Sequence, residues 1–487
     1  MILKEKIFEY LKDKKIVLLG FGKSNQSVAK FLDELAINFQ VRDQKSFDLN
    51  IKFKNSKPEF IFGKNYLKNL NCDLIFRSPG IRPDLIENEN FILTSEIEFF
   101  FKFCPTNNLF AVTGSDGKST TTSIIYELLK NSGKQVFLGG NIGTPILPQI
   151  CKISDKDFVV LELSSFQLIT CKINPKVAVI TNISENHLDW HKNFDEYVDS
   201  KINIFKNQGK NLELSQNKNV LPLKTTLFSS HRSERMNSFK SSYDNLFVSN
   251  FDCKILNEIS EKATRKKRFF SVESKISDGC YLDEDGYINF CEDDKVFKII
   301  HKDEIKIPGI HNIENFMAAI SACYDFVSLE NIKFVASNFK GLAHRIEFVA
   351  EIAGARYYDD SIASTPNRVL KGAFSIFENS IILIAGGYDK NLDFEEFGKK
   401  ICEKVKILIL IGQAAEKIEN CIKNCKNFKK PKVFKVDSMK NAVNFAYQNA
   451  FKNDIILLSP ACASFGMYNN FEERGEDFKN CVLNLKK

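Results

Sequence analysis

The stretch TGSDGKSTTT, residues 113–122, has the residue types that a phosphate-binding loop requires. Gly114 and Gly117 permit a tight turn in which successive backbone N–H groups face a phosphate. Lys118 carries a charge that matches β- and γ-phosphates, and Ser119 offers a hydroxyl to Mg²⁺. An apolar run precedes the loop and a helix-like stretch follows it, so that the helix N-terminus would face the anion.

The loop departs from the common P-loop, which has a glycine where this chain has Val112. An ordinary turn before a helix that happens to contain Gly-Lys-Ser is the alternative. Because strand, loop and helix follow one another in the right order, we favour phosphate binding. The pattern predicts a nucleoside triphosphate and does not specify the reaction.

Three further side chains have both a metal-binding and a structural interpretation. Glu162 ends the apolar run of FVVLEL, where an acid is costly unless it meets a cation such as Mg²⁺; a charge pointing out of the sheet edge is the alternative. His187 follows a strand end in TNISENHLDWH, and a single histidine is more often structural. Lys201, in DEYVDSKINIF, is by default a solvated helix residue.

Later motifs place polar residues at helix starts and in loops. IPGIHNIENFMAA puts Asn312 and Asn315 on one helix face, which capping also explains. Four more motifs, GLAHRIEFV, YYDDSIASTPN, IAGGYDKN and SPACASFGMYNNFEERG, supply His344, Arg345, Asp360, Ser364, Lys390, Ser464, Phe465, Phe471 and Arg474. Each motif is compatible with ordinary loop chemistry, and their order along the chain makes the set informative.

Short β-branched runs followed by Gly or Ser and then by a helix-like stretch recur, as in KIVLLG, LFAVTG and IILIAGG. Such alternation indicates parallel sheets covered on both faces and therefore an α/β fold. A chain of 487 residues is too long for one core. We predict three domains: a Rossmann-like domain over 1–105, a P-loop ATPase-like domain over 106–341 and a Rossmann-like domain over 342–487. The stretch 205–305 predicts only peripheral strands and loops.

Composition narrows the class of protein. The apolar content of 44% and charged content of 26% are those of a soluble globular protein, and the net charge of +7 is spread along the chain. This pattern disfavours nucleic-acid binding and suits small anionic substrates. The 13 cysteines lack paired spacings, and the N-terminus lacks the apolar core of a signal peptide. We expect a cytoplasmic monomer without a membrane span.

Taken together, the motifs resemble those of the Mur ligase family over nearly the whole chain except 205–305. The most specific element is SPACASF with NFEERG, followed by PGIHNIEN and ELSSFQL. The family loop has the shorter form Gly-Thr-Asn/Asp-Gly-Lys-Ser/Thr, which does not require a glycine at Val112. The resemblance implies an ATP-dependent amide ligase of peptidoglycan synthesis. It would add glutamate, D-glutamate by family default, to UDP-N-acetylmuramoyl-L-alanine through an acyl phosphate.

The resemblance also implies roles for individual residues. ATP would be held by Gly114, Ser115, Asp116, Gly117, Lys118, Ser119, Thr120, Asn312, Asn315, Arg345 and Asp360. Two Mg²⁺ ions would be held by Ser119, Glu162, His187 and Lys201, the last as a carbamate formed with CO₂. The catalytic group would comprise Lys118, Glu162, His187, Lys201 and His344. The UDP and muramoyl portions would contact Gly20, Gly22, Ser24, Asp43, Ser78, Gly80 and Asn141. A further substrate contact would be Ser164. Glutamate would contact Ser364, Lys390, Ser464, Phe465 and Phe471.

The chain departs from the family pattern at two places. Glutamate ligases usually have Asp-Ser-Lys-Ala-Thr-Asn where this chain has DSIASTPN, so that Ile362 replaces a lysine and Pro366 follows. A lost cation near anionic substrates leaves L-glutamate as an alternative acceptor. Asp116 stands where asparagine is common among glutamate ligases.

Other classes of protein stay open. A folylpolyglutamate-synthase-like ligase is disfavoured because about 105 residues precede the phosphate loop. A non-catalytic nucleotide-binding protein would not need Glu162, His187, Lys201 and Lys390 together. A dinucleotide-dependent dehydrogenase depends on GFGKSN alone, which lacks the third glycine of that fingerprint.

Overall fold

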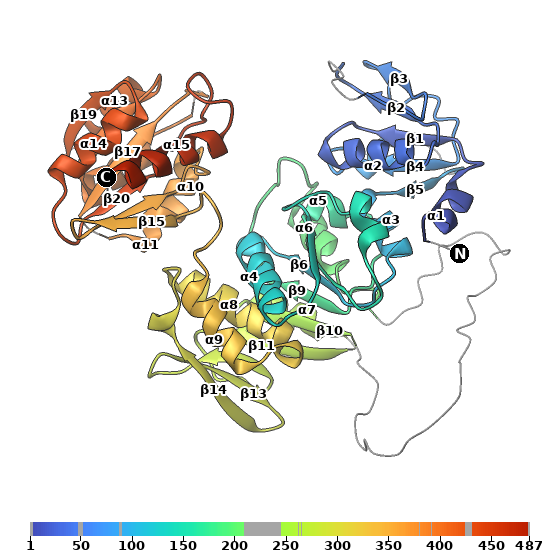
Figure 1. The fold of residues 1–487 in the computed structure, drawn as a ribbon, viewed down its shortest axis with the longest axis horizontal. Coiled ribbons are helices and arrows are strands. Elements are labelled where there is room, and N and C mark those ends of the chain that lie inside the picture. The colour runs from blue at the N-terminus through green and yellow to red at the C-terminus, as the bar shows by residue number, and fades with distance from the viewer. Residues whose placement is uncertain are drawn as a thin grey trace. The chain divides into compact units, whose positions relative to one another are not determined.

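The computed structural model describes residues 3–46, 52–86, 90–208, 245–261, 263, 265–378, 380–390, 392–423 and 431–485. These residues form three sheets with flanking helices, which confirms the predicted α/β class (Figure 1). The chain divides into two compact units, one of residues 1–304 with 313–336 and one of residues 305–312 with 337–487. None of the described helices is long and apolar enough to cross a membrane.

The first sheet has five parallel strands in the order β3-β2-β1-β4-β5. Its strands are β1 (Ile16–Leu19), β2 (Gln40–Asp43), β3 (Glu59–Phe62), β4 (Leu74–Arg77) and β5 (Ile92–Thr94). Its helices are α1 (Leu3–Leu11), α2 (Lys23–Glu34), η1 (Pro83–Leu85) and α3 (Glu96–Phe103). The strand order reverses direction between β1 and β4, and sheets of this type bind ligands outside the carboxyl ends at that point.

The second sheet has nine strands in the order β14-β13-β12-β11-β10-β9-β6-β8-β7. Its strands are β6 (Leu109–Thr113), β7 (Val136–Gly140), β8 (Phe158–Glu162), β9 (Val177–Ile180), β10 (Leu246–Asn250), β11 (Lys266–Ser271), β12 (Gly279–Leu282), β13 (Tyr287–Glu292) and β14 (Lys295–His301). Its helices are α4 (Lys118–Asn131), η2 (Leu147–Lys152), α5 (Ser165–Leu168), α6 (Phe194–Ile202), α7 (Lys254–Ser260), η3 (Lys302–Glu304), α8 (Ile310–Cys323), η4 (Tyr324–Phe326) and α9 (Leu329–Asn338). Only β12, β13 and β14 pair antiparallel.

The expectation that 205–305 holds only peripheral elements is wrong for β10. All five residues of β10 are buried, and the strand pairs in parallel with β9 and β11, so it extends the main sheet. Its run of five residues lies in a polar stretch and gives little periodic signal. The segment 209–244 lies outside the described residues.

The third sheet has the order β15-β16-β20-β17-β18-β19, and only β15 is antiparallel to its neighbour. Its strands are β15 (Glu347–Ile352), β16 (Ala355–Asp359), β17 (Ile381–Gly386), β18 (Val405–Ile411), β19 (Lys432–Val436) and β20 (Ile455–Leu458). Its helices are α10 (Pro366–Lys371), α11 (Ala373–Ile376), α12 (Glu395–Lys404), α13 (Ala415–Lys423), α14 (Met439–Asn449) and α15 (Phe471–Asn484).

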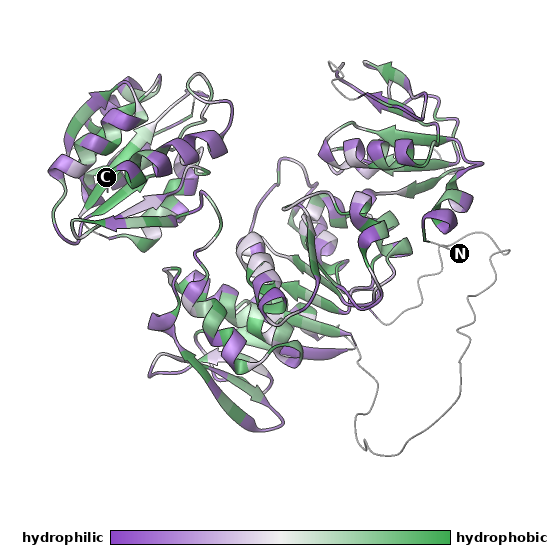
Figure 2. Cartoon of the chain, viewed as in Figure 1, coloured by the Kyte–Doolittle hydropathy of each residue, from purple (hydrophilic) through white to green (hydrophobic). Residues whose placement is uncertain are grey.

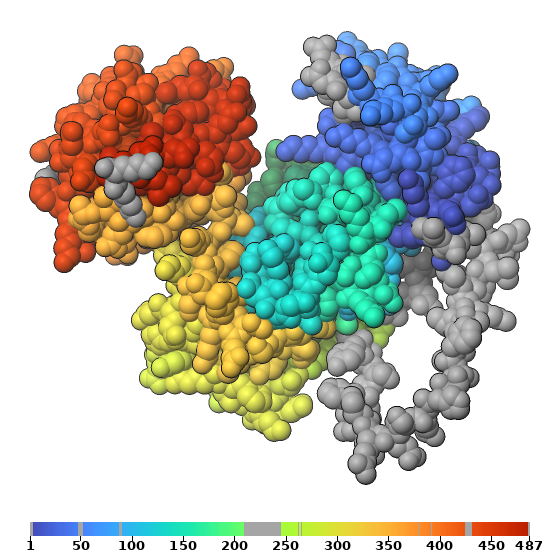
Figure 3. All heavy atoms as spheres, in the orientation of Figure 1, coloured from blue at the N-terminus to red at the C-terminus, as the bar shows by residue number. Residues whose placement is uncertain are grey.

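Apolar residues of the third sheet are buried on both faces. Helices α10 to α13 contribute to the core on one face, and α14 and α15 contribute to the core on the other. In the first unit, one continuous core joins α1, α2 and α3 to η2 and the second sheet, which explains why two sheets form a single unit. Figure 2 shows apolar residues concentrated on the strands, and Figure 3 shows the atoms at the surface of one face of the molecule.

Candidate functional site

The carboxyl ends of four parallel strands meet at one edge of the second sheet. In register, Gly140 of β7 pairs with Glu162 of β8, which pairs with Val112 of β6, while Thr113 pairs with Ile180 of β9. The phosphate loop leaves β6 at this edge and enters α4. The sequence-predicted loop and the acid of FVVLEL therefore lie on neighbouring strands.

Both loop glycines are required by their surroundings. Gly114 has a φ of 149° and Gly117 a φ of 77°, which are conformations that side chains rarely adopt. A Cβ on Gly114 would overlap the hydroxyl of Thr181, and a Cβ on Gly117 would overlap the amide oxygen of Asn315. Residues distant in sequence thus pack directly against the loop backbone.

The loop is held from the inside by hydrogen bonds. The hydroxyl of Ser115 lies 2.8 Å from that of Tyr197, and the backbone N–H of Asp116 donates to Asn182 Oδ1 at 2.8 Å. Lys118 Nζ donates to the carbonyl oxygen of Ser115 at 2.8 Å. The buried Ser115 side chain therefore holds the loop, whereas Asp116 is exposed.

The start of α4 presents hydroxyl groups next to this loop. Ser119 is half-buried and Thr120 is buried in the first turn. Thr121 donates a 3.1 Å hydrogen bond to Oδ1 of Asn315, whose side chain is buried. Asn312 lies in the second unit, where its amide donates to the carbonyl oxygen of Pro308 at 2.6 Å.

Glu162 is fully buried, with one carboxylate oxygen paired and the other free. Nδ2 of Asn141 donates to Oε1 at 2.7 Å, and Oε2 has no hydrogen-bond partner among the described residues. A buried carboxylate oxygen without a donor is costly. A cation next to Oε2 would remove that cost.

Lys201 lies on α6 with an exposed fraction of 1%, and its Nζ donates to the carbonyl oxygen of Gly114 at 2.8 Å. Burial first, and then the charge of Lys118, lower the pKa of this amine well below its ordinary range, against the opposing charges of Asp116 and Glu162. The lysine is therefore favoured in its neutral form. This environment differs from that of a solvated helix residue.

His187 lies in the loop after β9 in a left-handed conformation, with a φ of 55°. Its ring packs edge-on against Phe166, with centroids 4.8 Å apart. Desolvation and then the charge of Lys118 lower the pKa of the imidazole below its ordinary value. A neutral imidazole is the form that binds metal ions.

Sequence reasoning missed His191, four residues further along the same loop. Its ring is buried, stacks on Phe166 and places Nε2 3.0 Å from the hydroxyl of Ser165. On its other side, Nδ1 lies 3.4 Å from Oε2 of Glu196. The second histidine of HLDWH was the available signal.

Sequence reasoning also missed two arginines that join the first sheet to the second. Arg77 is buried at the end of β4 and donates to the carbonyl oxygen of Phe166 at 3.1 Å. Arg82 donates to the carbonyl oxygen of Trp190 and lies 3.2 Å from Oε1 of Glu196. A charge at the end of an apolar strand, the criterion that singled out Glu162, applies equally to Arg77.

The predicted UDP site lies at the reversal point of the first sheet. Gly20, with a φ of 77°, leaves no room for a Cβ beside Ser78, and Ser78 N–H donates to Leu19 O at 2.8 Å. The carboxylate of Asp43 accepts from the N–H of Phe21 at 2.7 Å. The turn after β1 and the loop after β4 thus lie side by side.

The remaining predicted substrate contacts of this unit have partners within the protein or lie at the start of a helix. Gly22 precedes α2, and Gly80 O lies 3.5 Å from the indole nitrogen of Trp190. The hydroxyl of Ser24 donates at 2.7 Å to the buried carboxylate of Glu96, and Ser164 caps α5 with Gln167 in a reciprocal capping box. The side chains of Ser24 and Ser164 are therefore engaged within the protein.

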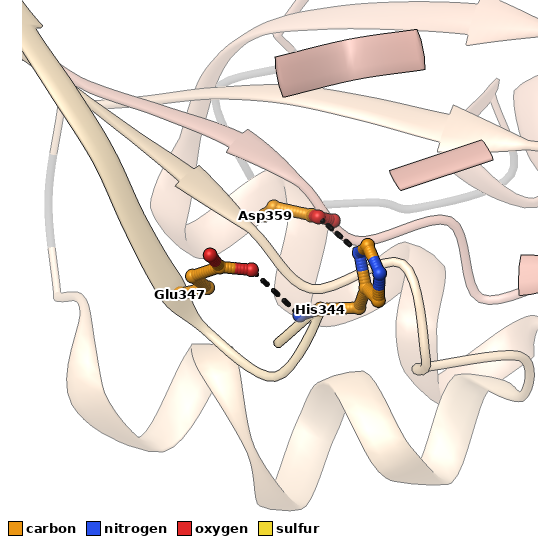
Figure 4. Close-up of side chains that lie close together, drawn as sticks. All are labelled: His344, Glu347 and Asp359. Atoms are coloured by element: carbon orange, nitrogen blue, oxygen red, sulfur yellow. Dashed lines mark hydrogen bonds and ion pairs between the residues drawn. The ribbon is translucent and has the colours of Figure 1, made fainter. Parts of the chain in front are cut away.

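In the second unit, His344 is locked by two acids (Figure 4). Its Nδ1 lies 2.7 Å from Asp359 Oδ2, and its backbone N–H donates to Glu347 Oε2 at 2.8 Å. The hydrogen bond to Asp359 raises the pKa of the imidazole. Asp359 and Glu347 both form hydrogen bonds to His344. These bonds explain why the three side chains lie close together, so their proximity is not evidence for a metal site.

Asp360 and Arg474 are buried next to His344 and Asp359. The hydroxyl of Ser459 donates to Asp360 at 2.6 Å, and burial raises the pKa of Asp360 to about 7. Arg474 donates to the carbonyl oxygens of Cys462 at 3.0 Å and Ser361 at 2.8 Å. Arg474 therefore holds the loops after β16 and β20 together.

Several predicted glutamate contacts lie on the loops after β17 and β20, which are joined by a bridge between Tyr388 and Ala463. Lys390 Nζ lies 5.6 Å from the ring centroid of Phe465, and Tyr388 packs edge-on against the same ring. Ser464 is buried on this loop. These residues form an aromatic surface next to one cation.

The other predicted contacts of this unit lie nearer β16. Ser364 is half-buried in the loop before α10. Phe471 begins α15, its ring centroid is 6.1 Å from that of His344, and its carbonyl oxygen accepts from Ser361 at 2.8 Å. Burial raises the pKa of Asp360, and the positive charge of Arg345 opposes that rise only in part.

Comparison with known proteins places this arrangement in a family. Three profiles match in order: the MurD N-terminal domain over 15–86, the Mur ligase middle domain over 112–220, and the glutamate ligase domain of Mur ligases over 344–462. A UDP-N-acetylmuramoylalanine--D-glutamate ligase of Ruminiclostridium cellulolyticum is 41% identical over 490 residues, 98% of each chain. The chain belongs to the Mur ligase family. The enzyme of the same name from Clostridium acetobutylicum is 40% identical, again over 98% of each chain.

Solved Mur ligases share the fold at low identity. UDP-N-acetylmuramate-alanine ligase MurC of Thermotoga maritima is 18% identical, with a TM-score of 0.55 over 97% of this chain and 100% of its own. MurF of Acinetobacter baumannii is 15% identical, with a TM-score of 0.57 over 98% of both chains. These likenesses confirm the predicted three-domain Mur ligase fold.

Proposed function

We propose that this Mur ligase joins D-glutamate to UDP-N-acetylmuramoyl-L-alanine in peptidoglycan synthesis, with ATP as the energy source. The names of relatives about 40% identical over nearly their full lengths support this assignment. They favour D-glutamate over L-glutamate as acceptor, and ligation over folate-type substrates or non-catalytic binding. The residues argued below supply the chemistry.

One observation carries the proposal: buried Glu162 keeps an unpaired oxygen at the sheet edge from which the phosphate loop leaves. The loop backbone and Lys118 suit the phosphates of ATP. The substrate carboxylate attacks the γ-phosphorus and ADP leaves, giving an acyl phosphate. The amine of glutamate then attacks the acyl carbon, loses a proton and displaces phosphate.

The residues at this edge also fit divalent metal ions. Ser119, Glu162 and His187 provide the oxygen and neutral nitrogen ligands, and the unpaired oxygen of Glu162 and the lowered pKa of His187 support that assignment. Magnesium, when bound, neutralises charge on the phosphates. We assign these residues as its ligands.

Lys201 suits carbamylation by CO₂. A neutral amine is the nucleophilic form of lysine, and burial favours that form at this position. Addition of CO₂ with loss of a proton converts the side chain to an anion. That anion would offset the charge of Lys118 and bind a second metal ion.

The test uses the full chain with ATP, Mg²⁺ and UDP-N-acetylmuramoyl-L-alanine, with D-glutamate and L-glutamate in separate reactions. Phosphate release and product mass are measured. We expect release that depends on the muramoyl substrate and on D-glutamate, with a product heavier by one glutamyl residue. Equal or greater turnover with L-glutamate, or release without glutamate addition, would reject the assignment.

A further inference from the structure

The glutamate acceptor of the proposed reaction carries two carboxylates, yet the predicted contacts in the second unit include one cation, Lys390. The resemblance to glutamate ligases implies a lysine at position 362, where this chain has the uncharged Ile362 in the loop after β16. Two carboxylates brought to one cation leave an anion without a partner. A second cation on these loops would pair with the other carboxylate.

Two of the neighbouring cations are already engaged. Lys417 pairs with Asp389 at 3.2 Å, and buried Arg474 donates to Ser361 and Cys462. Arg368, on α10, is exposed, and one of its guanidinium nitrogens donates to the carbonyl oxygen of Ile362 at 3.0 Å. Within the described part of the chain, no carboxylate pairs with Arg368.

The hydrogen bond places the Arg368 charge beside the uncharged side chain of Ile362. The Ile362 carbonyl also accepts from the N–H of Ser364 at 2.8 Å, and the N–H of Ile362 donates to His344 O at 3.1 Å. Both the N–H and the carbonyl group of Ile362 are therefore held by backbone hydrogen bonds, which fixes the group that accepts from the guanidinium. Arg368 has five N–H donors in a planar fork, and one of its nitrogens bonds to this anchor.

The loop is positioned to act together with Lys390. Asp359 of β16, Leu458 of β20 and Ile384 of β17 lie in register, so the loops after these strands leave the same sheet edge. Strands are about 4.8 Å apart, so the ends of β16 and β17 are separated by roughly 10 Å. A glutamate flanked by an arginine and a lysine side chain spans that distance.

We propose that Arg368 binds one carboxylate of the incoming glutamate, in place of the lysine absent at position 362. The guanidinium fork matches a carboxylate in two parallel hydrogen bonds. This inference rests on the proposed glutamate ligation. It assigns a substrate-binding residue at a position that carries no motif of its own.

The decisive variant is Arg368→Gln, which keeps an N–H for the Ile362 carbonyl and removes the charge. We expect the KM for D-glutamate to rise roughly 10- to 100-fold, as for loss of a charge-assisted hydrogen bond, with the KM values for ATP and the muramoyl substrate within twofold of wild type. Lys371→Ala is the matched control, because it removes an exposed cation from the same helix. It should leave all three constants unchanged.

Restoring the lysine provides the converse experiment. Adding Ile362→Lys to Arg368→Gln should return the KM for D-glutamate at least tenfold toward that of wild type. A KM for D-glutamate within twofold of wild type in Arg368→Gln, or an equal rise in all three constants, would overturn the proposal. Absence of glutamate ligation by the wild-type enzyme would instead reject the proposed function.

Discussion

Asn141 donates its side-chain N–H to Oε1 of Glu162 at 2.7 Å, across the neighbouring ends of β7 and β8. The bond fixes the carboxylate and leaves Oε2 as a buried acceptor without a donor. Asn141 was expected to contact the muramoyl substrate. Its described contact orients the acid that we assign to magnesium, and the muramoyl contact stays a prediction.

Glu162→Gln should lower kcat at least about 100-fold at ordinary Mg²⁺ concentrations and raise the Mg²⁺ concentration needed for half-maximal activity. The amide keeps the shape of the side chain and removes the charge that favours a cation. Activity measured across a Mg²⁺ titration checks this. Glu127→Gln, at a glutamate that bonds to Asn131 on α4, is the control and should behave as wild type.

An unchanged Mg²⁺ requirement in Glu162→Gln would contradict the metal assignment. Direct Mn²⁺ binding, followed by electron paramagnetic resonance, gives a second measurement that does not depend on turnover. Wild-type affinity for Mn²⁺ in the variant would have the same meaning.

Lys201→Ala should be inactive in phosphate release and partly recover when formate or acetate is added, because a short carboxylate would take the place of the proposed carbamate. Lys118→Ala should also lose turnover, since it removes the phosphate-neutralising charge, but should not respond to added carboxylate. This contrast distinguishes the roles of the two lysines. They are close enough in the fold that the charge of Lys118 adds to the effect of burial in lowering the pKa of Lys201. Full activity of Lys201→Ala without any addition would exclude Lys201 from the site.

Asp360 makes stability depend on pH. Burial raises its pKa from 3.8 to about 7 in the folded protein, so folding favours the protonated acid. This contribution to the free energy of unfolding is fully present below the unfolded pKa and is lost as the pH rises through about 7. Between pH 5 and 8, the free energy of unfolding of wild type should fall by about 3 kcal/mol relative to that of Asp360→Asn. Urea unfolding of both proteins at several pH values measures this difference. Parallel dependence of the two unfolding free energies on pH would refute the prediction.

The fold class follows directly from the sequence, because continuous apolar strands followed by helices leave few arrangements other than parallel sheets covered on both faces. The strand β10 was missed as part of the main sheet. Its five buried residues lie within a polar stretch, so local periodicity does not distinguish it from a peripheral strand.

The loop pattern indicated Lys118, and an acid at the end of an apolar strand suggested Glu162, whereas Lys201 was indicated only by the family resemblance. It did not indicate side-chain direction, which depends on partners far along the chain. Ser24 bonds to Glu96, 72 residues away, and buried His344 bonds to Asp359. Such partners are visible only after folding.

The two loop glycines have a consequence for engineering. Their backbone shape depends on Thr181 and Asn315, which occupy the space that a Cβ would need. Grafting residues 113–122 alone into an unrelated scaffold would transfer the sequence of the loop without the side chains that define its backbone conformation. A graft would also have to include Thr181 and Asn315.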